Sequence, residues 1–316
     1  MADRPAQIDV PGLDLRHCPV EEHARALVEL GCLPYWWYQG ASRVLGNYSL
    51  PFCDANGNWW FQVKPGFCWP MDCFRPIELG KAVPAYAKTY VGFQHVLPDE
   101  AAANSHLTIN AVLDLSTYGS ESVNAKRRNA VRKGFKACDL EVLANLDAET
   151  IAGCCAAWND LTARTGWKHA ADEKTFSRSW HMLRDVPGVS IIVGREHQSG
   201  EVAGFLVTKI IGDTAYVDTI ASRTDLLHAN VNDAVMYAFL INATKLPGVC
   251  KAHYAIKSTV ESLERFKTGL GFVPHPFPAM LKLRPGVPLL LSLFAREKYR
   301  RMQGRYDDAL GDGPPA

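Results

Sequence analysis

The pattern of apolar and polar positions is most regular in the second half of the chain, where it predicts an alternation of helices and strands. Ser199-Gly200 and Gly212-Asp213 are short turns that join three strands into antiparallel hairpins. The segment from Ala234 to Ile241 is apolar on almost all sides, so the helix that contains it is expected to be buried. In chain order the predicted elements are helices at 150–165 and 172–185, strands at 189–194, 202–211 and 214–221, a helix at 226–245, a strand at 249–256, a helix beginning near residue 258, and a strand from residue 272.

The stretch 258–272 reads as a complete unit of helix and following strand. Ser258 and Glu261 have the spacing of a capping box, and two glycines, at 269 and 271, supply backbone conformations that end a helix. The apolar stripe of this helix consists of Val260, Leu263, Phe266 and Leu270. Lys267 lies beside the stripe, and spacing alone favours a lysine whose stem covers apolar surface while its ammonium reaches water.

The first half is rich in aromatic residues, with fifteen between residues 35 and 95, including Tyr35-Trp36-Trp37-Tyr38. Asn56-Gly57, between Phe52-Cys53 and Trp59-Trp60-Phe61, is typical of a two-residue hairpin turn. These rings either fill a core of short strands, which we favour for most of them, or line a pocket that stacks on a sugar, a base or an aromatic substrate.

A strand at 106–115 leads into a helix from about residue 120, whose second half, 126–136, carries six basic residues and no acid. Basic residues near a helix C-terminus complement the helix dipole, which explains part of this run. Arg128 and Arg132 are four residues apart and therefore share a face. Two guanidiniums on one face can hold a phosphate, so this pair is a candidate phosphate clamp.

Composition restricts the class of protein. The chain has 316 residues, 47% hydrophobic and 21% charged, which is enough for a large core and suggests two domains. The net charge of +1 gives no global case for nucleic-acid binding, so any such case depends on a local patch. Nine scattered cysteines suit reduced thiols in the cytoplasm, and we expect no secretory signal and no membrane-spanning run. The spacing of Cys53, Cys68 and Cys73 does not match a zinc knuckle, so no metal site is expected.

Two motifs resemble one family. Leu263-x-x-Phe266-Lys267-x-x-Leu270-Gly271-Phe272 resembles the closing helix and strand of the GNAT N-acyltransferase fold, and its Phe-Lys pair is similar to that of the Fem-type aminoacyl transferases. The run from Leu113-Asp114-Leu115 to the basic helix with Arg128 and Arg132 resembles the same group near the end of its first domain. The order of elements in the second half is also that of the GNAT fold.

The resemblance implies an α+β fold with a mixed sheet and two tandem GNAT-like domains. We expect a first, aromatic-rich domain at 1–145 and a second domain at 146–285 that carries the Phe-Lys motif. The C-terminal helix, 286–305, is expected to pack back on the first domain, although an apolar helix followed by basic residues could instead touch a membrane surface. Residues 306–316 are expected to form a disordered tail.

The resemblance also implies a reaction: a bacterial-type enzyme transfers an aminoacyl group from charged tRNA to the amine of a small molecule or peptide. In the Fem-type group the lysine of the Phe-Lys pair stabilises the oxyanion, and that role is carried over to Lys267. Asp218, in a central strand, is a candidate acceptor of the amine's proton. The remaining candidates, taken as substrate-binding residues, are Tyr216, Tyr254, Lys257, Phe266, Arg128 and Arg132.

Most GNAT enzymes use acetyl-CoA, whose pyrophosphate binds a Gly-rich turn at a helix N-terminus. The corresponding segment here, 221–230, contains no glycine and carries Asp225. We therefore expect no resident cofactor, with aminoacyl-tRNA as the preferred co-substrate and an acyl-CoA as the alternative. A third possibility, from another class, is a non-catalytic GNAT-like module that binds an anionic saccharide.

Overall fold

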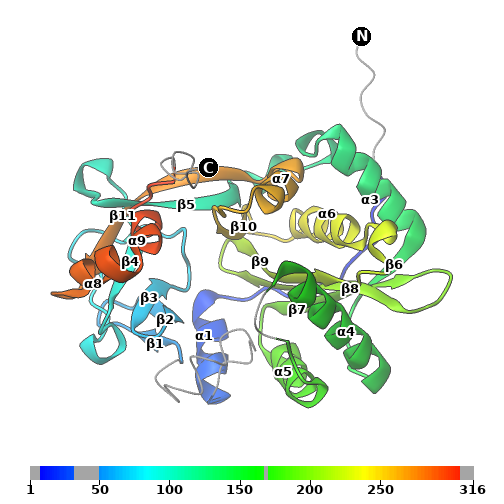
Figure 1. The fold of residues 1–316 in the computed structure, drawn as a ribbon, viewed down its shortest axis with the longest axis horizontal. Coiled ribbons are helices and arrows are strands. Elements are labelled where there is room, and N and C mark those ends of the chain that lie inside the picture. Colours follow the sequence, from blue (N-terminus) through cyan, green and yellow to red (C-terminus); the bar gives the residue numbers. More distant parts are fainter. Residues whose placement is uncertain (1–7, 32–49, 167–169, 307–316) are drawn as a thin grey trace, which may run out of the picture.

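The computed structural model of the chain describes residues 8–31, 50–166 and 170–306, and its strands form one mixed 11-stranded sheet (Figure 1). The strand order is β1-β2-β3-β4-β11-β5-β10-β9-β8-β7-β6. The strands are β1 (Phe52–Cys53), β2 (Trp59–Lys64), β3 (Phe67–Pro70), β4 (Gly92–Val96), β5 (Ser105–Val112), β6 (Cys138–Val142), β7 (Val189–Glu196), β8 (Val202–Ile211), β9 (Thr214–Ser222), β10 (Lys251–Ile256) and β11 (Val273–Leu283).

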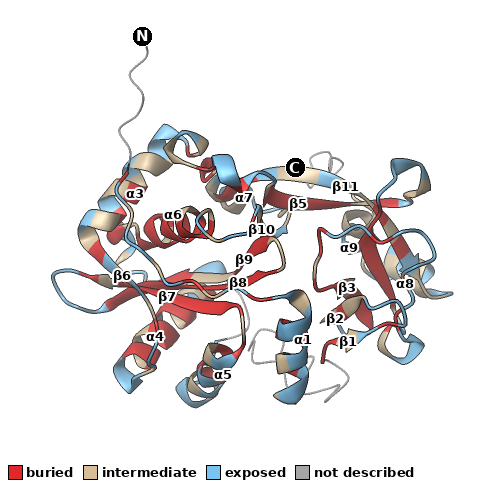
Figure 2. Ribbon diagram, turned by 180° about the vertical axis from the view of Figure 1, so that it is seen from behind, coloured by how far each residue is buried: buried red, intermediate tan, exposed pale blue. Residues whose placement is uncertain are grey.

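Helices cover both faces of the second half of the sheet. The α-helices are α1 (Val20–Glu29), α3 (Ala125–Ala137), α4 (Ala148–Thr165), α5 (Glu173–Asp185), α6 (Val231–Ala243), α7 (Glu261–Gly269), α8 (Val287–Phe294) and α9 (Arg296–Met302). Side chains of α4 and α5 pack on one face of β7 and β8, while α6, with α3 against it, packs on the other (Figures 1 and 2). The strands between these helix layers are buried, as their near-continuous apolar sequences require.

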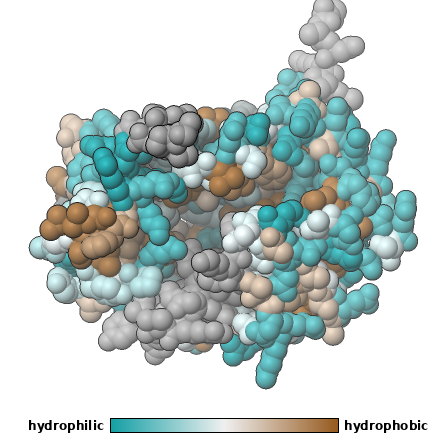
Figure 3. Space-filling view, in the orientation of Figure 1, coloured by the Kyte–Doolittle hydropathy of each residue, from teal (hydrophilic) through white to brown (hydrophobic). Residues whose placement is uncertain are grey.

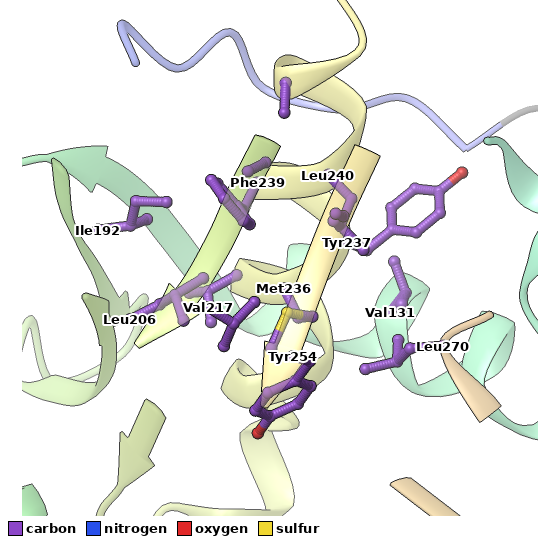
Figure 4. Packing of buried hydrophobic residues seen from close by; sticks show 14 of the residues in the cluster. Val131, Ile192, Leu206, Val217, Met236, Tyr237, Phe239, Leu240, Tyr254 and Leu270 are labelled. Atoms are coloured by element: carbon purple, nitrogen blue, oxygen red, sulfur yellow. The ribbon is translucent and has the colours of Figure 1, made fainter. Parts of the chain in front are cut away.

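The cluster around α6 joins the sheet to α3 and α7. In Figure 4, Val217 of β9, Met236 of α6 and Leu270, which follows α7, meet in one apolar layer. Helices α3 and α6 approach closely because Gly134 faces Ala234; a Cβ at position 134 would lie 2.6 Å from the Ala234 Cβ. The predicted burial of α6 is confirmed, although α6 runs from Val231 to Ala243 and is shorter than the predicted helix at 226–245.

Strand β11 leaves the second half and pairs with strands of the first. It lies between β4 and β5, antiparallel to both, and β5 also pairs with β10. Strand β6, which precedes the expected boundary at residue 145, pairs with β7 of the second half. The α+β class and the mixed sheet are confirmed, whereas the boundaries of two domains stay a prediction.

Three local predictions need correction. Phe52–Cys53 and Trp59–Lys64 do form a hairpin, but five residues connect them and the Asp54 carboxylate, which accepts the N–H of Asn56, organises the loop. The capping box is absent: α7 begins at Glu261, and the Ser258 hydroxyl accepts the N–H of Val260 instead. Val260 is exposed and does not belong to the apolar stripe.

The chain returns to the first half at its C-terminal end, as expected. The Gln94 side-chain amide donates to the carbonyl of Met302, and the N–H of His106 donates to the carbonyl of Gln303. Helix α9 makes this return through Met302, and neither α8 nor α9 has a fully buried residue. The aromatic run 35–38 lies outside the described residues.

Candidate active site

The central strands β9 and β10 separate partway along their length. They pair in parallel only from Thr214 to Tyr216 and from Lys251 to His253. Beyond His253 the register of β10 against β5 shifts, and Ala255 lies in the left-handed region at φ 57°. A non-glycine residue there is uncommon and marks a local distortion of the strand. We call residues 217–220 of β9 and 254–256 of β10 the fork. Its β9 side is half-buried over residues 218–220, whereas residues 214–217 are buried.

Lys267 lies at the β10 side of the fork and is almost fully buried, with a relative exposure of 1%. Its ammonium donates to the Glu264 carboxylate at 3.0 Å and to the carbonyl of Ile256 at 3.2 Å. The expectation that Lys267 reaches water is therefore wrong. Burial lowers the pKa of this ammonium, and the hydrogen bond and charge of Glu264 oppose that shift.

Two aromatic residues complete this face. The Lys267 Nζ lies 5.1 Å from the centroid of the Tyr254 ring, and the Phe266 ring lies edge-on to the same ring at 6.5 Å. In Figure 4, the Tyr254 hydroxyl points away from the other labelled residues of the apolar cluster. The Arg127 guanidinium of α3 lies over the Phe266 ring, 4.7 Å from its centroid, so Phe266 packs between α3 and α7.

Asp218 lies where the register of β9 against β8 shifts, between Val217 and Thr219, and it shares Lys209 with Tyr216 on the face of the sheet away from α6. Lys209 donates to its Oδ1 at 3.0 Å, and its Oδ2 is buried without a hydrogen-bond partner in the part of the chain that the structure describes. Burial raises the pKa of Asp218, and the charge of Lys209 opposes this. The Asp218 side chain is 14% exposed, so it is largely desolvated but keeps some contact with solvent.

Tyr216 and His253 lie beside Asp218 on this face. Their ring centroids are 5.0 Å apart, and the Tyr216 hydroxyl donates to Asp72 at 3.5 Å. Burial and the positive charges of Lys209 and Lys267 lower the pKa of His253, which keeps its imidazole neutral. Asp72 in turn borders a cavity of about 460 Å³ that is also lined by Trp59.

The other candidates lie away from the fork or have structural partners. The Arg128 guanidinium donates to the carbonyls of Ser120 at 3.1 Å and Val123 at 2.5 Å, which holds the turn before α3. Arg132 instead lines a separate cavity of about 580 Å³ beside residues 8–11. Lys257 lies just beyond β10 with its Nζ 5.3 Å from the Tyr306 ring. The joint phosphate clamp stays a prediction.

Sequence reasoning missed several groups at the fork. Glu264 lies three residues before Lys267 on one helix, a spacing that brings side chains together and could have been noticed. Lys209 and His253 come from β8 and β10, and their proximity to Asp218 and Tyr216 depends on strand register, for which the sequence carries no local signal. Asn110 of β5 donates to Glu264 at 3.2 Å and comes from the other half of the chain.

Two carboxylates lie at the N-terminus of α6, and each is paired with an arginine. Asp233 in the first turn of this helix is buried and forms an ion pair with Arg127 at 3.0 Å, while Asp225 pairs with Arg223 just before it. Asn230, which caps the helix, adopts a left-handed conformation at φ 53°, where glycine is the usual residue. The dipole of α6 is thus already complemented by a carboxylate of the chain itself.

Among the described residues, no three histidine, cysteine, aspartate or glutamate side chains are grouped to hold a metal ion. Cys68 and Cys73 are buried and Cys53 is exposed.

No family model matches the chain, and no curated protein does so either. Solved structures do match. A crystal structure of FemX superposes with a TM-score of 0.52 at 11% identity, covering 87% of this chain and 98% of its own. The chain has a fold like that of FemX.

Two further structures of this Fem-like fold agree over nearly the whole chain. L-PGS from Bacillus licheniformis has a TM-score of 0.51 at 14% identity, covering 94% of this chain and 99% of its own. The C-terminal domain of a putative lysylphosphatidylglycerol synthetase from Agrobacterium fabrum has a TM-score of 0.52 at 13% identity, covering 91% and 99%. In the described part of the chain, none of the helices combines the length and apolar character needed to cross a membrane.

Proposed function

We propose that the chain is an N-acyltransferase that moves an aminoacyl group from charged tRNA to the amine of a small molecule or peptide. The observation that carries the proposal is the fork, which has the buried Lys267–Glu264 pair on one face and the desolvated Asp218 on the other. A donor placed between β9 and β10 would meet a cation from one face and a base from the other. The similarity to the FemX structure supports the fold of this chain, and the fork is part of that fold.

The reaction needs a base and an oxyanion stabiliser. The amine nitrogen attacks the ester carbonyl, and the oxyanion that forms lies against the Lys267 ammonium. The unpartnered Oδ2 of Asp218 accepts the amine's proton, a role that its raised pKa favours. The C–O bond to the ribose then breaks, and the proton passes from Asp218 to the ribose oxygen, which leaves as a hydroxyl. Because Lys267 is almost fully buried, the proposal implies that the fork opens when the donor binds.

Aminoacyl-tRNA is preferred over acyl-CoA because the turn before α6 has no glycine and Asp233 already occupies the first turn of the helix. A pyrophosphate there would meet Asp225 and the Asp233 carboxylate instead of free backbone N–H groups. Calorimetry with acetyl-CoA is expected to show no tight binding. A low-micromolar affinity would contradict this preference and favour the acyl-CoA alternative.

The test is a product assay in which a mixture of charged tRNAs and, separately, acetyl-CoA are supplied with a pool of amines. We expect consumption of the aminoacyl ester, and Lys267→Met should lower turnover by about 10²–10³-fold, the usual effect of losing one oxyanion donor. Arg265→Met, on the exposed side of the same helix, is the matched control. Equal turnover of the Lys267 variant and the control would contradict the mechanism, and no turnover of either donor by the native chain would favour the binding module.

A further inference from the structure

The most exposed apolar surface of the described chain lies on α8. Leu289, Leu290, Leu293 and Phe294 have relative exposures of 63%, 56%, 66% and 83%. Positions i, i+1, i+4 and i+5 fall on one side of a helix, so these four side chains form a single apolar face. In Figure 3 it is the brown patch at the left edge, at the place of α8 in Figure 1. We call it the α8 face.

Aromatic and basic residues surround the α8 face. Tyr86, which is 69% exposed, stacks on the Arg284 guanidinium at 3.9 Å, and Arg284 lies just before α8. Directly after α8, Arg296 and Lys298 are exposed. Arg284, Arg296 and Lys298 are thus the basic residues that border α8 in the sequence, whereas Arg300, Arg301 and Arg305 line a separate pocket with Thr259. Positive charge is therefore concentrated where the apolar face is.

We propose that the α8 face docks on a membrane surface that contains anionic phospholipid. Apolar side chains on one side of a helix can enter the acyl boundary of a bilayer while flanking cations meet lipid phosphates. Tyrosine and arginine at the rim are suited to the headgroup region, where one end of the side chain is apolar and the other is hydrated. The helix lies along the surface in this arrangement and does not cross the bilayer.

Charge complementarity favours a bilayer over a second copy of this chain. Two copies meeting through the α8 face would bring together the cations that flank it in each copy, Arg284, Arg296 and Lys298, and like charges across an interface oppose association. An anionic leaflet offers both an apolar layer for Leu290 and Phe294 and negative charge for Arg296 and Lys298.

The test uses the full chain and co-sedimentation with two kinds of vesicle: equal parts phosphatidylglycerol and phosphatidylcholine, or phosphatidylcholine alone. We expect binding to the anionic vesicles that weakens with added salt. Leu290→Ser with Phe294→Ser should weaken it at least about a hundredfold, because two apolar side chains no longer leave water. Arg296→Gln with Lys298→Gln should weaken it about thirtyfold, at about 1 kcal/mol for each charge.

Val28→Ser with Leu227→Ser is the matched control, because it removes two exposed apolar side chains from elsewhere on the surface and should leave vesicle binding unchanged. Since all the substituted residues are exposed, circular dichroism should be the same for every variant. Native chain that stays in the supernatant, or α8 variants that bind as the control does, would overturn the proposal. So would a concentration-dependent dimer that Leu290→Ser with Phe294→Ser abolishes, since the α8 face would then be an interface between copies.

Discussion

Replacing Lys267 by methionine should destabilise the fold as well as impair catalysis. The substitution keeps an unbranched apolar stem but leaves the Glu264 carboxylate, which is 15% exposed, without its cation. Removing one partner of a buried ion pair typically costs about 3–5 kcal/mol, because the other charge stays in a poorly solvated place. Glu264 keeps two donors, the N–H of Ser258 at 2.8 Å and the Asn110 amide at 3.2 Å. We therefore expect a loss near the lower end, about 3 kcal/mol.

Urea denaturation of a double-mutant cycle isolates the contribution of the pair. Glu264→Gln in the Lys267→Met background removes the stranded charge, so the double variant should recover about 1–2 kcal/mol relative to Lys267→Met. Arg265→Met breaks an exposed pair with Glu261, whose atoms are 3.8 Å apart, and should change the free energy of unfolding by less than about 0.5 kcal/mol.

A cost of Lys267→Met no larger than that of Arg265→Met would refute this reasoning, because it would mean that the ammonium is solvated in solution. The same result would undermine the proposed mechanism, in which a desolvated cation faces the oxyanion. Turnover of the Lys267 variant has to be measured below its unfolding transition, so that lost activity is not lost fold.

Two further predictions concern other parts of the chain. Arg128→Ala should lower the free energy of unfolding by about 1–3 kcal/mol, because two carbonyls lose a charged donor. Arg132→Ala should barely change the free energy of unfolding. If Arg132 contacts a phosphate, the same substitution should reduce the salt dependence of tRNA binding by about one unit of slope. An unchanged salt slope would show that Arg132 does not contact a phosphate of the tRNA. His23 is fully buried, donates to the Pro187 carbonyl, and has its pKa lowered by burial to about 4. Since the unfolded chain binds the proton from about pH 6.5 downward, stability should fall by about 2 kcal/mol between about pH 7 and pH 5 through this residue, and denaturation of His23→Gln should show that part of the slope removed.

The elements of the second half could be predicted because their signals are local. The turns at 199–200 and 212–213 and the apolar runs between them lie within a few residues of one another, and the structure has strands there. The placement of β11 between β4 and β5 could not be predicted in this way. It pairs Leu281 with Gln94, residues far apart in sequence, and nothing in the alternation of β11 states which strands it will join.

The error about Lys267 has a similar physical origin. A periodicity argument treats lysine as polar and assigns it to the surface, and that assignment fails when a carboxylate and a carbonyl are supplied at the buried position. Glu264 could have been found from its spacing, but the Ile256 carbonyl comes from the irregular end of β10, where Ala255 has a positive φ and the register against β5 shifts. The sequence shows that a charged pair exists on this helix, whereas its burial follows from strand geometry.

The fork depends on both halves of the chain. On one face, Asn110 of β5 donates to the carboxylate that holds Lys267; on the other, Asp72 accepts from Tyr216 beside Asp218. Because β11 is inserted between β4 and β5, helix α7 immediately before it is fixed against the first half as well as the second. The aromatic-rich first half therefore contributes directly to the candidate active site. It supplies part of the hydrogen-bonded support for each candidate catalytic group, so substitutions at Asn110 or Asp72 are expected to alter the fork without touching the reacting atoms.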